Sequence, residues 1–200
     1  MPSESLSRGE QTRTQIVQTA HDLFIQQGYH GTSLRQIATE AGIALGGVYN
    51  HFNSKEEIFE DVFQEYHPYH QVIPLLLNTK GNTIEERVRN AANQMVEIIN
   101  KRPDFLNLMF IEVVEFKSIH ARDLFTHILP QTILVADHII GGENNHLRNI
   151  PPAMLIRSFL GLFFTYYLTE ILFANVDSND FRENTMDYIV DVYLHGILDA

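Results

Sequence analysis

The chain contains no cysteine and no tryptophan. Without cysteine, disulfides, thiolate metal sites and cysteine nucleophiles are excluded, and a reducing cytoplasm is the expected setting. The first residues, MPSESLSRGE, are polar and lack the apolar core of a secretory signal. The most apolar stretch, residues 156–174, is interrupted by polar side chains, so we expect a buried helix there and no membrane partner.

Positive charge is also scarce. The formal net charge is −11 at pH 7, which disfavours non-specific attraction to nucleic acid because phosphate neutralisation needs clustered Lys and Arg. Residues 1–60 hold four basic side chains, Arg8, Arg13, Arg35 and Lys55, against seven acidic ones. Any contact with DNA must therefore depend on where these few cations lie, including those of the polar arm around Arg8 and Arg13.

Common enzyme and metal motifs are absent from the sequence. It has no glycine-rich phosphate loop and no His-Glu-x-x-His zinc pattern. The histidine pairs His67/His70 and His120/His127 match no recognised ligand spacing, so we expect solvated or hydrogen-bonded histidines rather than a metal site. We expect no cofactor and no enzyme activity.

Apolar residues recur at helical spacing, and strand-like alternation persists nowhere. The first helix is expected to end at Gly28, and Ser33 with Gln36 predicts a capped second helix of about two turns that closes at Gly42. Residues 45–52 can form another short helix. Ser54 and Glu57 predict the start of a fourth helix, which Pro68 and Pro74 should end or kink. Further helices are expected at 84–99, opened by Thr83 with Glu86, and at about 104–118, 121–140, 152–175 and 180–198, with loops at 141–145 and 177–179.

A short capped helix, a glycine turn and a second short helix are what a helix-turn-helix requires. The second helix contains Gly46 and Gly47, each about 1 kcal/mol worse than alanine in a helix. A purely structural helix has little reason to carry two glycines, whereas a helix that approaches DNA closely does. The alternative is an ordinary helix pair in which Tyr49 and Phe52 are core residues.

The same segment resembles the N-terminal signature of the tetracycline-repressor (TetR) family. The resemblance is carried by GTSLRQIATEAGI at 31–43, by Gly46, Val48, Tyr49 and Phe52, and by SKEE at 54–57, within about residues 10–63. It implies an all-α homodimer of about nine helices. The expected domains are a three-helix helix-turn-helix DNA-binding domain at 1–54, a connector helix at about 55–72, and a helical ligand-binding and dimerisation domain at 73–200.

Position by position, the resemblance implies a set of DNA contacts. Ser33, Arg35 and Lys55 should meet phosphates. Tyr49 and His51 should contact the backbone or base edges, and Gly46, Gly47 and Asn50 should face bases, with Asn50 able to pair bidentately with adenine. Two positions depart from the family pattern: Ala44 replaces a Ser or Thr cap, and Leu45 replaces a basic residue but can contact a thymine methyl.

The later helices carry more large apolar residues than a single layer needs. Candidate residues for a ligand pocket are Met95, Met109, Phe110, Glu112, Phe116, Phe125, Phe163, Tyr166 and Tyr167. Plain core packing is the alternative for each of them. The last two helices are apolar over wide arcs, which favours a four-helix dimer interface over a monomer. Its candidates are Ser158, Leu162, Ile189, Val190, Tyr193, Leu194 and Ile197.

These features together predict a ligand-responsive DNA-binding regulator. We expect a cytoplasmic repressor that is released from a double-stranded, palindromic DNA operator by an apolar small molecule. One alternative is a helical ligand carrier or enzyme with a vestigial helix-turn-helix. Another is a helical adaptor that binds protein partners through its late apolar helices.

Overall fold

The computed structural model describes residues 7–141, 148–173 and 184–198, and these fold into helices without strands. The helices are α1 (Arg8–Gly31), α2 (Leu34–Glu40), α3 (Leu45–Tyr49), α4 (Lys55–Tyr66), α5 (Tyr69–Leu77), α6 (Ile84–Asn100), α7 (Phe105–Glu115), α8 (Ile119–Ile140), α9 (Pro152–Leu172) and α10 (Thr185–Ile197). The all-α expectation is confirmed. The loops expected at 142–145 and 177–179 lie outside the described residues.

Local sequence signals explain where α2 and α4 begin. The Ser33 hydroxyl accepts a hydrogen bond from Gln36 N and the Gln36 side chain accepts one from Ser33 N, so the expected capping box is confirmed. The Ser54 hydroxyl likewise accepts from Glu57 N, but the Glu57 carboxylate accepts from Asn53 N, one residue before the cap. The cap is therefore correct and its reciprocal bond is displaced by one residue.

The expected connector helix at about 55–72 is wrong in extent. α4 ends at Tyr66, and a separate helix, α5, begins at Tyr69. His67 adopts an extended backbone because the following Pro68 disfavours the helical conformation of the residue before it. Pro68 then starts α5, which contains Pro74. This extra helix raises the number of helices in the described residues to ten, against about nine expected.

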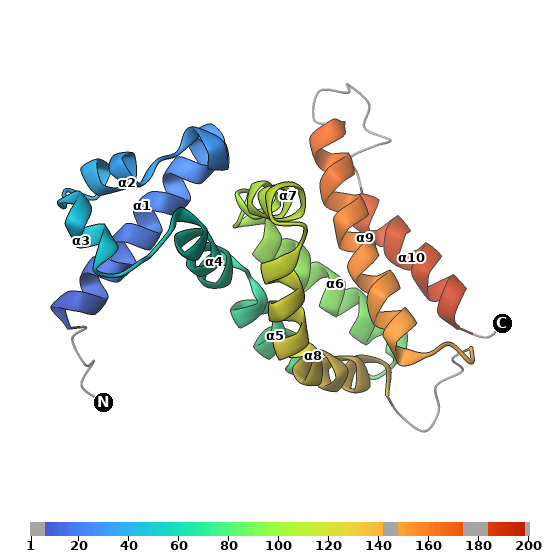
Figure 1. The fold of residues 1–200 in the computed structure, drawn as a ribbon. Helices are drawn as coiled ribbons and strands as arrows, with labels where there is room; N and C mark the ends of the chain where they lie inside the picture. Colours follow the sequence, from blue (N-terminus) through green and yellow to red (C-terminus); the bar gives the residue numbers. More distant parts are fainter. Residues whose placement is uncertain (1–6, 142–147, 174–183, 199–200) are drawn as a thin grey trace. The chain divides into compact units, whose positions relative to one another are not determined.

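The chain divides into two compact units. The first unit comprises Met1–His67 and Arg102–Thr126, and the second comprises Pro68–Lys101 and His127–Ala200. In the first unit α1 packs on α2, α4 and α7, α2 packs on α3, and α4 also packs on α7 (Figure 1). Its core contains Ile16, Ala20, Phe24, Ile37, Val48, Phe52, Ile58, Phe59, Val62 and Phe63. The first unit thus includes α7, although α5 and α6 separate α7 from α1–α4 in the sequence.

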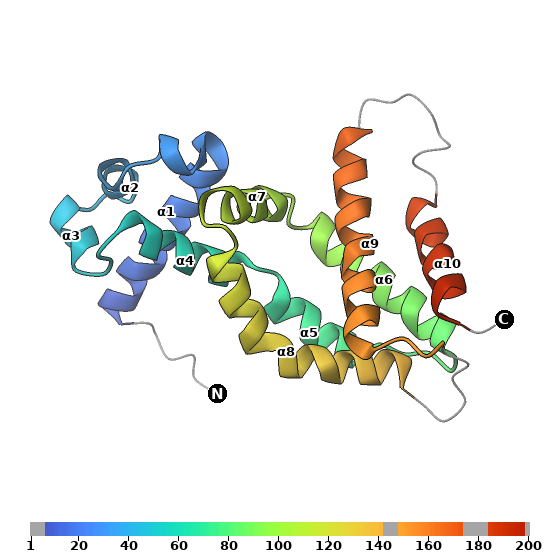
Figure 2. The same ribbon diagram turned by 45° about the vertical axis from the view of Figure 1, so that its right-hand side comes forward.

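In the second unit α10 packs against α6 and α9, and α5 packs against α6 (Figure 2). Arg87 of α6 donates hydrogen bonds to the carbonyl oxygens of Ile139 and Gly141, which fixes the C-terminal end of α8. The Tyr193 hydroxyl donates to Leu155 O at 3.1 Å and thereby ties α10 to the start of α9.

The candidate dimer residues occupy two different environments in this unit. Val190, Tyr193, Leu194 and Ile197 are buried in its core. Their assignment to a dimer interface is wrong because a side chain that is already buried offers no surface to a second copy. Ser158 is exposed, and Leu162 and Ile189 are half-buried.

The exposed apolar side chains of α9 and α10 lie elsewhere on these helices. On α10, Tyr188 is 67% exposed and Val192 is 74% exposed. On α9, Phe164, Ile171 and Leu172 are exposed. By length and composition α9 is apolar enough to cross a membrane, as the core helix of a soluble protein also can be. In α9 Leu155 and Phe163 are buried and most other side chains are exposed or half-buried, so the expectation of a buried helix is wrong.

Candidate nucleic-acid interface

The turn between α2 and α3 is built as a helix-turn-helix requires. Gly42 adopts φ +66°, a left-handed conformation that side chains other than glycine rarely take. Ile37 and Ala38 of α2 are buried, as is Val48 of α3. Gln15 of α1 donates a hydrogen bond from Nε2 to Ala41 O at 2.8 Å, which holds the end of α2 against α1.

Helix α3 separates cleanly into an inner and an outer face. Val48 and the following Phe52 are buried, whereas Tyr49 is 53% exposed and Asn50 is exposed. The interpretation of Tyr49 as a core residue is therefore wrong, and that of Phe52 is confirmed. The helix is shorter than the expected 45–52, and its N-cap, Ala44, makes no side-chain hydrogen bond. The outer face presents Gly46, Tyr49 and Asn50 together.

Neither glycine of α3 is required by the fold of the chain. A Cβ atom at Gly46 would meet nothing within 4 Å, and one at Gly47 would lie 3.8 Å from Ile43, an ordinary contact. Both glycines have helical backbone angles rather than positive φ. Glycine weakens a helix, so helix stability does not explain why Gly46 is present. The open surface at Gly46 is suited to close approach by a large partner.

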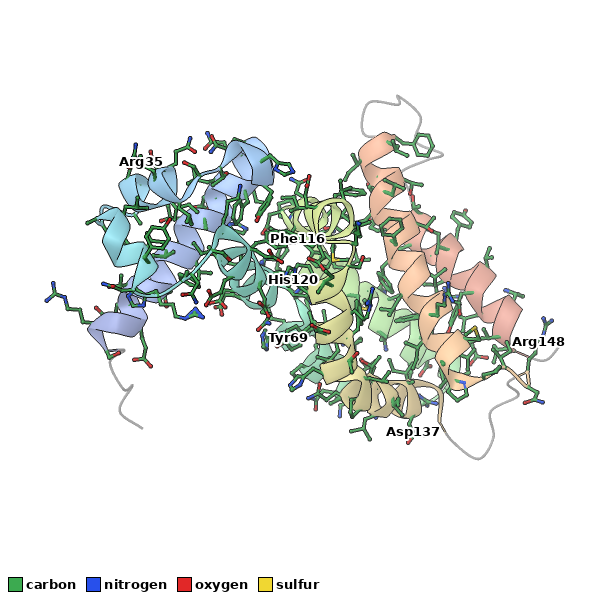
Figure 3. All side chains as sticks on the ribbon, viewed as in Figure 1. Arg35, Tyr69, Phe116, His120, Asp137 and Arg148 are labelled. Atoms are coloured by element: carbon green, nitrogen blue, oxygen red, sulfur yellow. The ribbon has the colours of Figure 1, made fainter. Side chains whose placement is uncertain are left out.

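The other candidate contact residues lie around this face. Arg35 is exposed on the outer side of α2 (Figure 3). The Ser33 hydroxyl donates to Gln36 Oε1 at 3.0 Å and accepts from Gln36 N at 3.2 Å, so it is already engaged in the cap. Leu45 and His51 are half-buried. A Cβ at Gly9 would lie 4.0 Å from the His51 ring, which places the start of α1 beside the end of α3.

Lys55 is held inside the first unit. Its Nζ donates to Tyr29 O at 2.7 Å and to Thr32 O at 2.8 Å, and it lies 4.0 Å from the centroid of the Tyr29 ring. Burial lowers the pKa of Lys55 from its usual value, while the Glu115 carboxylate acts in the opposite direction. The family resemblance implies a phosphate contact at Lys55, and the sequence holds no signal for these internal bonds.

Arg13 is likewise engaged within the unit. Its guanidinium pairs with the Asp61 carboxylate of α4 and lies 4.5 Å from the centroid of the Phe52 ring. Arg13 of α1 thus packs on the ring of Phe52, which follows α3. Arg13 is therefore part of the scaffold beneath α3. Of the two cations in the expected arm, only Arg8 is exposed and makes no ion pair with the residues that the structure describes.

Comparisons with known proteins agree with this geometry. Residues 16–62 match the family model described as bacterial regulatory proteins, tetR family. Over these residues the chain is similar to the DNA-binding domain of that family. The chain is 33% identical over 99 residues to the uncharacterized HTH-type transcriptional regulator YuxN of Bacillus subtilis, covering 48% of this chain and 33% of that one. It is 38% identical over 65 residues to the HTH-type transcriptional repressor KstR2 of Mycolicibacterium smegmatis, covering 32% and 30% of the two chains.

These matches cover about a third of each curated relative's own length. The fold match is broader. NalD of Pseudomonas aeruginosa, the secondary repressor of the MexAB-OprM multidrug efflux pump, aligns with a TM-score of 0.67 over 95% of this chain and 98% of that structure, at 18% identity. This likeness shows the same fold as that structure over nearly the whole chain.

A polar cluster joins the start of α7 to α1 and α4 within the first unit. His21 of α1 bonds through Nε2 to the Asp104 carboxylate at 2.8 Å, and its ring stacks on Tyr66 with 3.7 Å between centroids. Arg102 donates to Tyr66 O at 2.6 Å. Burial raises the pKa of Asp104, but the hydrogen bond from His21, a backbone hydrogen bond and the Arg102 charge outweigh it, so this pKa lies below its usual value. Sequence spacing could not indicate the cluster because its members come from distant helices.

A second link lies at the turn between α7 and α8. The buried Glu112 carboxylate accepts from Ala121 N at 2.9 Å and bonds to His120 Nδ1 at 2.8 Å. Phe116 stacks on Phe59 of α4 with 4.6 Å between centroids and lies 4.8 Å from the His120 ring (Figure 3). Both oxygens of Glu112 are thus used internally, which makes it a structural carboxylate. Among the described residues, no three His, Asp or Glu side chains gather as a metal site.

The candidate pocket residues fall into both units. Met109, Phe110, Glu112, Phe116 and Phe125 belong to the first unit, and Met95, Phe163, Tyr166 and Tyr167 belong to the second. Met95 and Phe163 are buried in the core of the second unit, and Tyr166 and Tyr167 are half-buried at its edge. Phe110 and Phe125 are exposed, whereas Phe116 is buried. Their role in binding a ligand stays a prediction.

Proposed function

We propose that this chain is a TetR-family transcriptional regulator, not an enzyme, which binds a palindromic DNA operator as a homodimer in the cytoplasm. The observation that carries the proposal is the outer face of α3. A short helix with its apolar side buried presents an open glycine, an exposed tyrosine and an exposed asparagine. That combination suits insertion into the major groove, where Asn50 can pair with the edge of an adenine base. Tyr49 can contact the sugar-phosphate backbone of the DNA.

The proposed dimer uses the uncovered faces of α9 and α10. Tyr188 and Val192 on α10 and Phe164, Ile171 and Leu172 on α9 expose apolar surface that a second copy would cover. A two-fold dimer places its two α3 helices in successive major grooves, about 34–36 Å apart. The acidic net charge limits non-specific binding, so the affinity for an operator depends on this spacing.

We further propose that an apolar small molecule releases the DNA and so relieves repression. Shifting the DNA-competent population by two orders of magnitude requires about 2.7 kcal/mol of differential affinity between the two conformations. Burial of about 110 Å² of apolar ligand surface in only one conformation supplies this amount. Methionine and aromatic side chains among the candidate pocket residues fit such a ligand.

Selection of duplexes from a random pool tests the proposal and yields the operator sequence directly. The purified protein should enrich a palindrome with two half-sites about one helical turn apart. Tyr49→Ala should then weaken binding to all duplexes about equally, whereas Asn50→Ala should relax discrimination at one base pair in each half-site by about 1–3 kcal/mol. The assigned roles are contradicted if no sequence is enriched. They are also contradicted if both variants lose the same affinity at every base-pair position.

A further inference from the structure

We infer that Leu45 is a specificity-determining residue that recognises a methyl group in the DNA. At the base pairs that face the first turn of α3, it should contact the C5-methyl group of a pyrimidine, either thymine or 5-methylcytosine. The inference deepens the proposed function and rests on it. It depends on the side chains at the start of α3, on the exposure of Leu45, and on the groups that the major groove presents.

No side chain at the start of α3 can form a hydrogen bond. Residues 43–48 have the sequence IALGGV, in which every side chain lacks a polar atom. The N-cap, Ala44, is exposed and makes no side-chain hydrogen bond. Tyr49 is the first residue of α3 whose side chain can donate or accept one. Hydrogen bonds from α3 side chains to base edges are therefore confined to its C-terminal end, at Tyr49 and the following Asn50.

Leu45 is the largest side chain at the N-terminal end of α3, and part of it is accessible. It is half-buried, whereas Val48 is fully buried in the core of the first unit. Leu45 lies four residues before the exposed Tyr49, so the two occupy neighbouring positions on one side of the helix. The adjacent Gly46 leaves open space, since a Cβ there would meet nothing within 4 Å. A base pair that approaches Gly46 closely is therefore also within reach of Leu45.

The major groove offers an apolar side chain only one kind of favourable contact. The N-terminal residues of a recognition helix contact base edges there. Guanine, adenine and cytosine present hydrogen-bond donors and acceptors, whereas thymine also presents its C5-methyl group. Packing this methyl group against leucine removes apolar surface from water, and the burial of one methyl group raises the affinity about fourfold. Two half-sites together give about 15-fold. 5-Methylcytosine carries the same methyl group at the same ring position.

Base substitution in a duplex that the wild-type protein selects tests the contact, with affinity measured by fluorescence anisotropy. Each thymine is replaced by uracil, which lacks only the methyl group, at the symmetric positions of both half-sites. At one or two base pairs per half-site, uracil should lower the affinity about 15-fold. At the same positions, a pair of 5-methylcytosine with guanine should bind about 15-fold more tightly than an unmethylated cytosine pair. Equal binding of the two cytosine duplexes would overturn the inference.

Variants of the protein assign the methyl contact to Leu45. In Leu45→Ala, the ratio of the affinities for thymine and uracil should fall from about 15 to about two or less. Leu34→Ala is the matched control, because Leu34 is the first residue of α2 and is likewise half-buried. It should keep the wild-type ratio even if its overall affinity falls. A wild-type ratio in Leu45→Ala would overturn the inference, because the methyl group would then act without this side chain.

A second variant serves if Leu45→Ala does not fold. Leu45→Arg should select guanine at the affected base pair, because arginine pairs bidentately with guanine O6 and N7. Continued selection of thymine by this variant would overturn the inference. If the wild-type protein selects a duplex but binds its thymine and uracil forms equally at every position, the inference fails and the proposed function stands. If it selects no duplex, both fail.

Discussion

Replacing Gly46 with alanine should change folding stability and DNA affinity in opposite directions. Gly46 lies in α3 with helical backbone angles, and an added Cβ meets no atom within 4 Å. Alanine is favoured over glycine in a helix by about 0.5–1 kcal/mol, so the free Gly46→Ala protein should be more stable by that amount. For a chain of this length this corresponds to a rise in melting temperature of about 1–4 °C.

The same methyl group should weaken DNA binding because it occupies the space between α3 and the floor of the groove. An overpacked contact typically costs about 1–3 kcal/mol, which is about a five- to 150-fold loss of affinity. Thermal unfolding and anisotropy with a selected duplex measure the two effects. Gly28→Ala is the control for the stability assay and should destabilise by about 1 kcal/mol, because Gly28 has φ +78°. A stabilised Gly46→Ala protein with unchanged DNA affinity would refute the proposed close approach.

Two further predictions concern the α7 junction and the dimer. Asp104 has a lowered pKa, so its ionised form stabilises the fold above the unfolded pKa of about 3.9, and this contribution is lost as the pH falls through the folded pKa. Asp104→Asn should therefore lower the free energy of unfolding, measured in urea, by about 1–2 kcal/mol at pH 7. The difference in stability between the variant and the wild type should shrink below pH about 3.9. A difference that does not change with pH would contradict the role of the ionised carboxylate. Val192→Glu should weaken dimerisation at least about 100-fold in sedimentation equilibrium, because an unpaired charge buried in the proposed interface costs about 3–5 kcal/mol. The control, Asn93→Glu at an exposed position of α6, should leave dimerisation unchanged. A dimer unaffected by Val192→Glu would place the interface elsewhere.

The sequence indicated those parts of the fold that depend on neighbouring residues. Helix caps at Ser33 and Ser54, the left-handed turn at Gly42 and the inward pair of Val48 and Phe52 are all local features, and the structure has them. The restriction that Pro68 places on His67 is local too, yet the expected helix at 55–72 ran across it. The expectation that Pro68 ends or kinks the fourth helix is confirmed, and the bound of about 72 for that helix is wrong.

Features that depend on distant residues were not accessible in this way. Lys55 looked like an exposed cation because its carbonyl partners lie 26 and 23 residues away along the chain. The packing of α7 on α1 joins His21 to Asp104 across 83 residues. The apolar arc of α10 showed that much of the helix is buried, but periodicity could not say which part faces its own core. The structure assigns Val190 and its neighbours to that core and leaves Val192 exposed.

Methylation interference on a selected duplex tests the insertion of α3 into the major groove most directly. Dimethyl sulfate modifies guanine N7 in the major groove and adenine N3 in the minor groove. The account predicts that binding is blocked by methylated guanines in two clusters about 10–10.5 base pairs apart, because each α3 of the dimer reads one major groove. Interference confined to adenine N3, or a single cluster with no symmetry mate, would contradict it.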